Sequence, residues 1–180
     1  MAEFHSYVRP LAHPRLSQFC TELTGITQAQ VDAAPPLAAV MRLAEAWMRE
    51  RGHLDAGSRV LFVTSGRWDL ATALPRNVEW WCAAERAGGA DPLEGGLPAY
   101  YLEWHDLKDS FRAHYRTHTR SFLGMLRHMD MELEGRHHSG IDDARNMARM
   151  VVRLLEEGYF FPRRGDTTSV RAARAAAQRC

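Results

Sequence analysis

The chain lacks several features that would assign it to a class of protein at once. Its 180 residues include only three cysteines, an odd number without the spacing of a metal-binding motif, which suits a reducing compartment. No apolar run approaches the length needed to span a membrane. The formal net charge is only +1, so the charge of the whole chain does not point to nucleic acid. We therefore expect a cytoplasmic or nuclear protein, without membrane contact, in which any nucleic-acid contact is local.

The composition is that of a globular protein. Hydrophobic residues make up 46% of the chain and charged residues 25%, mixed along its length, so residues 1–158 can bury a core as one domain. Residues 159–180 differ, because they hold five arginines and one acidic residue and end in alanine and arginine repeats. We interpret them as a basic tail outside the core, which either contacts phosphates or is simply solvated.

The order of the expected elements indicates an α/β protein. Residues 60–63 are continuously apolar, as in a strand buried on both faces, and a turn and a helix beginning near Asp69 follow them. Alternating residues 4–8 predict another strand. Thr27 and Gln30 have the spacing of a capping box, which starts a helix. Apolar spacing and breaker residues place the other helices at residues 28–33, 37–52, 106–115, 121–129 and 140–157, with a glycine-rich loop at 87–98.

The most informative stretch is residues 135–146, which precede and open the last helix. It places His138 five residues before Asp143. On a helical wheel Asp142 and Asn146 lie on the solvated face, whereas Asp143 lies at the border of the apolar arc. Free N–H groups and the helix dipole of the first turn favour a carboxylate there, and such a carboxylate is suited to a divalent cation. The alternative is that both aspartates are ordinary helix-start charges with Ser139 as the N-cap.

A second acidic residue is placed in a comparable way. Asp69 follows the carboxyl end of the buried strand, which is the edge where open α/β sheets bind ligands. A helix also starts there, so a helix-start charge is the alternative. Because His138, Asp143 and Asp69 all lie at the ends of predicted elements, they could converge into one site.

Several motifs in one order resemble a known family. Residues 4–10 (FHSYVRP), 19–28 (FCTELTGITQ), 68–70 (WDL) and 135–146 (GRHHSGIDDARN) closely resemble the DEDDh 3′–5′ exoribonucleases of the enhanced-RNAi or histone-mRNA type. The similarity extends from about residue 3 to residue 157. It implies a ribonuclease-H-like mixed sheet flanked by helices. It also implies hydrolysis of single-stranded RNA 3′ ends, with DNA as the alternative, by two Mg²⁺ or Mn²⁺ ions that four acidic residues hold.

The resemblance also assigns roles to individual residues. Asp69 and Asp143 match metal ligands, and His138 matches the general base that takes a proton from the attacking water, a role that suits imidazole near neutral pH. The substrate-binding residues that it implies are Leu23, Thr24, Gly25, Ile26 and Trp68. The alternative for residues 23–26 is a loop that connects helices, and the alternative for Trp68 is core packing.

The chain departs from the family at its start. Family members open with a strand bearing an Asp-x-Glu pair and a second strand, whereas this sequence begins at what resembles the third. Its Asp-x-Glu at residues 130–132 matches no metal position, and we interpret it as a solvated loop. We therefore expect a sheet without its first two strands. The gap would be filled by an upstream segment, by a partner protein, or by pairing of residues 4–8 with residues 60–63.

Two functions follow from these observations. One is an exoribonuclease that is active if the missing acidic pair is supplied. The other is a catalytically inactive subunit that serves nucleic-acid binding or the assembly of a larger complex, because hard cations need several oxygen ligands. Whether the chain is an enzyme thus depends on residues beyond His138, Asp143 and Asp69.

Overall fold

The computed structural model describes residues 2–80, 97–119 and 121–161, and the chain divides into two compact units. Unit 1 comprises residues 1–60, 75–98 and 133–146, and unit 2 comprises residues 61–74, 99–132 and 147–180. The long helix α7, Gly140–Glu156, contributes its first part to unit 1 and its remainder to unit 2. From residue 162 onward the expected basic tail lies outside the described residues, as does the expected glycine-rich loop up to residue 96.

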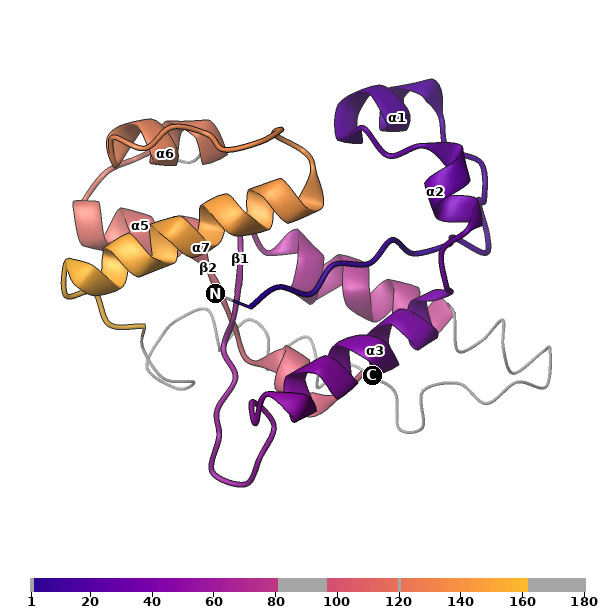
Figure 1. Cartoon of the computed structure of the whole chain (residues 1–180). Coiled ribbons are helices and arrows are strands. Elements are labelled where there is room, and N and C mark those ends of the chain that lie inside the picture. Colours follow the sequence, from indigo (N-terminus) through magenta and orange to yellow (C-terminus); the bar gives the residue numbers. More distant parts are fainter. Residues whose placement is uncertain (1, 81–96, 120, 162–180) are drawn as a thin grey trace. The chain divides into compact units, whose positions relative to one another are not determined.

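Unit 1 contains three helices near the N-terminus and an extended segment before them (Figure 1). The helices are α1 (Gln18–Thr24), α2 (Gln28–Asp32) and α3 (Leu37–Glu50). The capping box predicted at the start of α2 is confirmed, since the Thr27 hydroxyl accepts the N–H of Gln30 and the Gln30 amide oxygen accepts the N–H of Thr27 at 2.8 Å. The buried apolar residues of this unit are Val31, Ala34, Ala38, Val40, Met41, Met48 and Val78.

The extended segment, residues 2–9, forms no strand within the described residues, so the strand predicted there is wrong. Its described backbone–backbone hydrogen bonding consists of one contact, from the N–H of Arg9 to the C=O of Pro35 at 2.9 Å. Side chains hold the segment instead, and the Phe4 ring lies 6.1 Å from the Trp47 ring. A strand needs a partner that satisfies its backbone groups, and alternation of side chains alone does not supply one.

Unit 2 is organised around a two-stranded parallel sheet. Its strands are β1 (Phe62–Thr64) and β2 (Trp104–Asp106), and their register places Phe62 opposite Trp104 (Figure 1). β1 lies within two residues of its predicted position. The sequence analysis missed β2, because a tryptophan followed by histidine and aspartate shows neither alternation nor an apolar run. The sheet flanked by helices confirms the predicted α/β class, and its two strands agree with the expected sheet that lacks two others.

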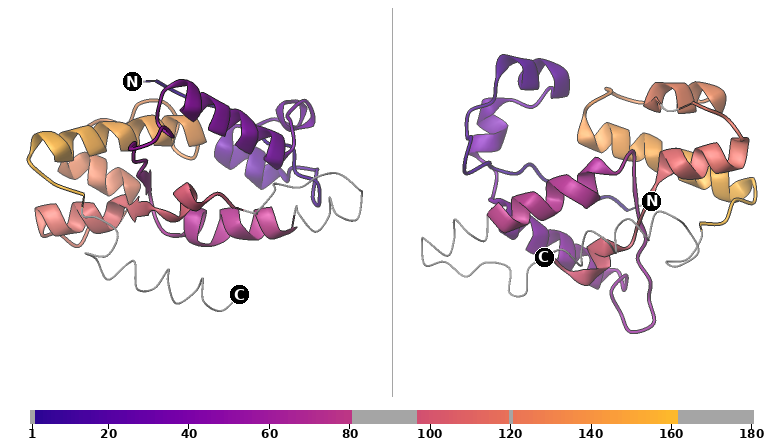
Figure 2. Two further views of the ribbon diagram at one scale, coloured as in Figure 1. Left: turned by 90° about the horizontal axis from the view of Figure 1, so that it is seen from below. Right: turned by 180° about the vertical axis from the view of Figure 1, so that it is seen from behind.

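The helices of unit 2 are η1 (Asp69–Ala73, π-helical), η2 (Ala99–Leu102, 3₁₀), α5 (Leu107–Tyr115), α6 (Phe122–His128) and the second part of α7. Helical backbone continues from η1 to residue 80. α5, α6 and the second part of α7 lie together (Figure 2), and they supply most of the buried residues, Leu107, Phe111, Phe122, Met125, Leu126, Met150 and Leu154. No described helix is long and apolar enough to span a membrane.

A hydrogen-bonded trio fastens the end of α7 to α5 in unit 2. The Tyr115 hydroxyl donates to the Glu157 carboxylate at 2.6 Å, and the His114 ring nitrogen lies 3.0 Å from the same oxygen. Burial and the neighbouring carboxylate disfavour the phenolate and raise the pKa of Tyr115 to about 12. The same hydroxyl holds the pKa of Glu157 below its usual value. Tyr115 and His114 thus both contact one carboxylate oxygen of Glu157 at the end of α7.

Candidate functional site

The loop before α7 and the first turn of that helix form a cluster of two histidines and an aspartate in unit 1. The His137 Nδ1 atom lies 3.0 Å from one carboxylate oxygen of Asp143, and the backbone N–H of His138 donates to the other oxygen at 3.1 Å. The two imidazole rings stack, with centroids 3.9 Å apart. The side chains of His137 and Asp143 are 28% and 24% exposed. The carboxylate is thus held by two successive residues of the loop.

The backbone of the loop brings these groups together. The N–H of Asp143 donates to the C=O of Ser139 at 2.9 Å, which makes Asp143 part of the first turn of α7. Its carboxylate therefore lies where the helix dipole favours negative charge. His138 has a φ of +71°, in the left-handed region, which costs roughly 1–2 kcal/mol for a residue other than glycine. Such a conformation persists only where surrounding contacts hold it, and it is common at functional sites.

The neighbouring aspartate has a different role. The Asp142 carboxylate accepts the backbone N–H of Arg136 at 3.0 Å and lies 3.3 Å from a guanidinium nitrogen of Arg145. The Arg136 N–H, the Ser139 hydroxyl and Arg145 together hold the pKa of Asp142 below its usual value, and the Arg136 contact is the main cause. Asp142 therefore closes the loop, whereas Asp143 faces the histidines.

Acid is expected to weaken this loop closure. The pKa of Asp142 is lower in the folded chain than in the unfolded chain, so its contribution to stability is complete above the unfolded pKa, roughly 3.9. The contribution is lost as the pH falls toward the folded pKa. We expect the difference in unfolding free energy between the wild type and Asp142→Asn to be largest near neutral pH and to shrink below about pH 4. Denaturant titrations across this range measure it, and a constant difference would contradict the assignment.

An asparagine fixes the loop to the helix from the other side. The Asn146 side chain accepts the N–H of Glu134 at 3.1 Å and donates to the carbonyl oxygens of Glu134 and Asp142 at 2.8 and 2.7 Å. Asn146 is fully buried. The helical wheel placed it on the solvated face, and that placement is wrong. A polar residue was assigned to solvent because the wheel does not show that the preceding loop folds back over it.

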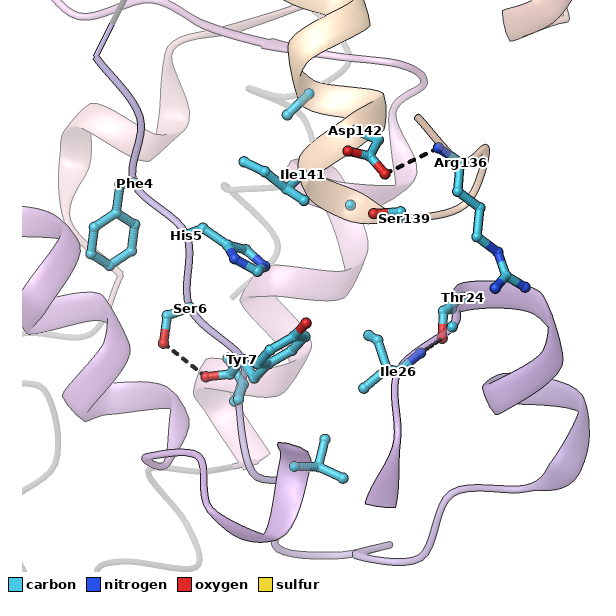
Figure 3. A pocket seen from close by; sticks show the side chains of 15 residues that line it. Phe4, His5, Ser6, Tyr7, Thr24, Ile26, Arg136, Ser139, Ile141 and Asp142 are labelled. Atoms are coloured by element: carbon cyan, nitrogen blue, oxygen red, sulfur yellow. Dashed lines mark hydrogen bonds between the residues drawn. The ribbon is translucent and has the colours of Figure 1, made fainter. Parts of the chain in front are cut away.

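A groove in unit 1 opens beside this loop and the extended segment (Figure 3). Its volume is about 710 Å³. Thr24, Gly25 and Ile26, three of the predicted substrate-binding residues, line it together with Asp142. The other lining residues include Phe4, His5, Ser6, Tyr7, Arg136 and Ile141. Apolar and polar side chains both line the groove, as is common in small-ligand and peptide sites.

Two hydrogen bonds of the Thr24 hydroxyl fix the turn at residues 24–26. The Thr24 hydroxyl donates to the C=O of Cys20 at 2.7 Å and accepts the N–H of Ile26 at 3.1 Å. Gly25 has a φ of +77° and lies against the guanidinium of Arg136, which donates to the carbonyl oxygen of Glu22. Leu23, at the end of α1, is exposed. This turn and the loop that carries His137 and His138 thus belong to one hydrogen-bonded part of unit 1.

The two remaining predicted residues lie in unit 2. Asp69 is the first residue of η1, and the preceding Trp68 is 64% exposed, which does not agree with core packing of its side chain. Asp106 ends β2 and caps α5 by accepting the N–H of Lys108 at 3.0 Å. Burial disfavours its charged form and raises the pKa of Asp106. The structure therefore brings His138 together with Asp143 in unit 1 and places Asp69 and Trp68 in unit 2.

The sequence analysis missed His137. The described residues of the chain contain a group of three potential metal ligands, His137, His138 and Asp143, whose ligand atoms all lie within 4.8 Å of one another. The signal was present in the sequence, since two adjacent histidines precede an aspartate of a helical first turn. The resemblance assigned a role to His138, the second of these histidines, and none to His137.

Comparison with known proteins identifies the family. The profile of the exonuclease family (RNase T) matches residues 1–151. ERI1 exoribonuclease 3 of Homo sapiens is 37% identical over 161 residues, which cover 88% of this chain but only 44% of that protein. This chain therefore spans less than half the length of that relative.

Solved structures agree with the sequence comparison. A structure described as "3′-end specific recognition of histone mRNA stem-loop by 3′-exonuclease" has a TM-score of 0.73 and 31% identity, covering 87% of this chain and 64% of that one. The nuclease domain of 3′hExo, described as a DEDDh family member bound to rAMP, has a TM-score of 0.71 and 31% identity, covering 87% and 72%. These matches confirm the predicted resemblance and the ribonuclease-H-like fold. The chain therefore belongs to the exonuclease family.

Proposed function

We propose that this chain is a 3′–5′ exoribonuclease-family domain that removes nucleotides from the 3′ ends of single-stranded RNA when the missing acidic pair is supplied, with residues 1–158 as the exonuclease-like domain. The observation that carries the proposal is the contact of the His138 backbone with Asp143 at the start of α7, which holds a base beside an acidic ligand. Family membership supports it, as does the similarity to an exonuclease described as recognising the 3′ end of a histone mRNA stem-loop.

His138 acts in this proposal as the general base. Its side chain is exposed, so water and an RNA end can reach the ring. Neutral imidazole accepts a proton near physiological pH, which suits activation of the attacking water. Asp143 in unit 1 and Asp69 in unit 2 are the residues that would hold Mg²⁺ or Mn²⁺, and such ions would polarise the phosphodiester and stabilise the leaving oxygen.

The described donors do not by themselves fit two hard cations. Mg²⁺ prefers a shell of six oxygens, whereas the cluster of unit 1 offers two imidazoles and one carboxylate. Asp130 and Glu132 are exposed in the loop after α6 and add no ligand to this cluster. We therefore propose hydrolysis by this route only where a further acidic pair joins Asp69 and Asp143.

The groove beside the cluster is proposed to hold the terminal nucleotides. Leu23, Thr24, Gly25 and Ile26 would contact the last nucleotide through the turn after α1. Trp68, an exposed residue of unit 2, is proposed separately as a side chain on which a base stacks. Stacking and backbone contacts are tolerant of sequence, so single-stranded DNA is the competing substrate. The basic tail at residues 159–180 would add phosphate contacts that weaken with salt.

The test is a nuclease assay on the purified chain extended at its N-terminus by a segment that carries an Asp-x-Glu pair. A single-stranded RNA labelled at its 5′ end is incubated with Mg²⁺ or Mn²⁺, and the expected result is stepwise shortening from the 3′ end that EDTA stops. The same oligonucleotide with a blocked 3′ terminus is the control and stays intact. An RNA that keeps its full length with either ion, although the acidic pair is present, would contradict the proposed hydrolysis.

A second candidate function is an inactive subunit that binds RNA or completes a larger assembly. The extended residues 2–9 favour it, because most of their backbone groups have no described backbone partner and they lie along an apolar groove. Such a segment can accept a strand from a partner protein. This candidate predicts salt-dependent RNA binding without shortening of the RNA, so one experiment separates the two functions.

A further inference from the structure

The cluster of His137, His138 and Asp143 has a donor set different from that of a magnesium site. Each residue offers one ligand atom, and these three atoms lie within 4.8 Å of one another. We propose that this cluster binds a single Zn²⁺ ion through two imidazole nitrogens and one carboxylate oxygen. His137 has no role in the proposed hydrolysis, and it supplies the second imidazole nitrogen that a zinc site needs.

The types of ligand favour zinc over magnesium. Zn²⁺ is bound in proteins by histidine nitrogens and carboxylate oxygens, often by three protein ligands with water in the fourth position. Mg²⁺ and Ca²⁺ instead select oxygen ligands. Two of the three donors here are nitrogens, and the exposed His138 leaves one side of the cluster open to water. The cluster therefore matches a three-ligand zinc site with one open position.

The distances suit a small ion. Ligand atoms bound to tetrahedral zinc at about 2.0–2.1 Å lie roughly 3.3 Å from one another. The His137 Nδ1 atom and the Asp143 carboxylate oxygen are already 3.0 Å apart. All three ligand atoms lie within 4.8 Å of one another. Rotation of the exposed His138 side chain would therefore bring its ring nitrogen to the distance that a bound zinc ion requires. A zinc ion would bind the unprotonated Nδ1 atom of His137 and the carboxylate of Asp143.

The cluster is also held in place before any ion binds. The His138 N–H fixes one carboxylate oxygen of Asp143 at 3.1 Å, and the two imidazole rings stack with an interplanar angle of 27°. His138 has a left-handed backbone, at φ +71°. The cost of ordering His137 and Asp143 is therefore largely met during folding, so that only the His138 side chain must still be oriented, and this favours binding.

Zinc at this position would have a consequence for the proposed hydrolysis. The ion would occupy the His138 nitrogen that the general base needs, so Zn²⁺ is expected to inhibit Mg²⁺-dependent shortening of RNA. This consequence rests on the proposed function, whereas zinc binding itself does not. The two can therefore be tested separately.

The experiment is a titration of the full chain with ZnCl₂ in competition with a coloured chelator. The wild type is expected to bind one Zn²⁺ per chain, and His137→Ala is expected to weaken the affinity at least about tenfold. His137→Asn is a second variant, because an amide keeps a hydrogen bond to Asp143 but is a poor zinc ligand. His13→Ala, which removes an exposed histidine outside the cluster, is the matched control and leaves the affinity unchanged. Circular dichroism verifies that each variant is folded.

The outcomes are distinct. Zinc binding that folded His137→Ala and His137→Asn both retain at full strength would overturn the inference, and so would displacement of Zn²⁺ by a modest excess of Mg²⁺. Ring ¹⁵N shifts of His137 and His138 on addition of ZnCl₂ would support it. Zinc binding by a chain that does not shorten RNA even when the acidic pair is supplied contradicts only the proposed hydrolysis. Shortening of RNA by a chain that does not bind zinc contradicts only this inference.

Discussion

Replacement of Asn146 by alanine is expected to lower the free energy of unfolding by about 2–3 kcal/mol. The asparagine satisfies the N–H and C=O of Glu134 and the C=O of Asp142 from a fully buried position. Alanine would remove all three contacts and leave the backbone groups without these partners. The loss of one partner of a buried hydrogen bond costs more than the bond contributes on average, because the remaining group is desolvated without compensation.

Chemical denaturation of the two proteins at neutral pH measures the effect. Gln18→Ala is a suitable control, since the Gln18 amide donates to Glu22 at 2.6 Å in an exposed position, where water can replace it. We expect the control to change stability by less than about 0.5 kcal/mol. A loss for Asn146→Ala as small as that of the control would show that Asn146 does not fasten the loop to α7.

Replacement of the His138 ring is expected to have the largest effect on catalysis. If the chain shortens RNA, His138→Asn should reduce the rate by about 10²- to 10⁴-fold, the usual contribution of a general base. Asparagine is chosen because it tolerates the left-handed backbone that His138 adopts at φ +71°. It also keeps the backbone N–H that donates to Asp143, so the position of the carboxylate is preserved.

Single-turnover rates with saturating enzyme measure this loss without interference from product release. The rate of His13→Ala should equal that of the wild type, because this histidine is exposed and lies outside the cluster. A rise in rate with pH in the wild type that disappears in His138→Asn would identify the imidazole as the base. A rate that His138→Asn leaves within about threefold of the wild type would assign proton removal to another group.

Local elements of the fold could be predicted from sequence because their determinants are local. The capping box at Thr27 and Gln30 and the apolar spacing of α3 and α7 all act within a few residues. The helices α2, α3, α5, α6 and α7 were therefore placed to within a few residues, whereas α1 and η2 were missed. β2 was missed, because its residues become a strand only through pairing with β1. The paired residues of β1 lie 42 positions earlier in the sequence.

The errors of the sequence analysis share a physical cause, which is contact between residues distant in sequence or in neighbouring elements. Alternation at residues 4–8 predicted a strand, but no described backbone pairs with it along its length. The wheel assigned Asn146 to solvent, although the loop at Glu134 covers it. The choice of Asp143 over Asp142 as the candidate ligand remains a prediction, and the position of His137 beside Asp143 could be seen only in three dimensions.

The extended segment at residues 2–9 has a consequence for the dynamics of unit 1. It is held by side chains, including the two hydrogen bonds from the Arg145 guanidinium to the Glu3 carboxylate at 2.8 and 2.9 Å, and hardly by its backbone. The segment can therefore detach without breaking any helix or strand, at a free energy below that of global unfolding. Its amide hydrogens would exchange with solvent quickly while those of α7 exchange slowly. This part of the chain would thus open first, and it would uncover the floor of the groove when it does.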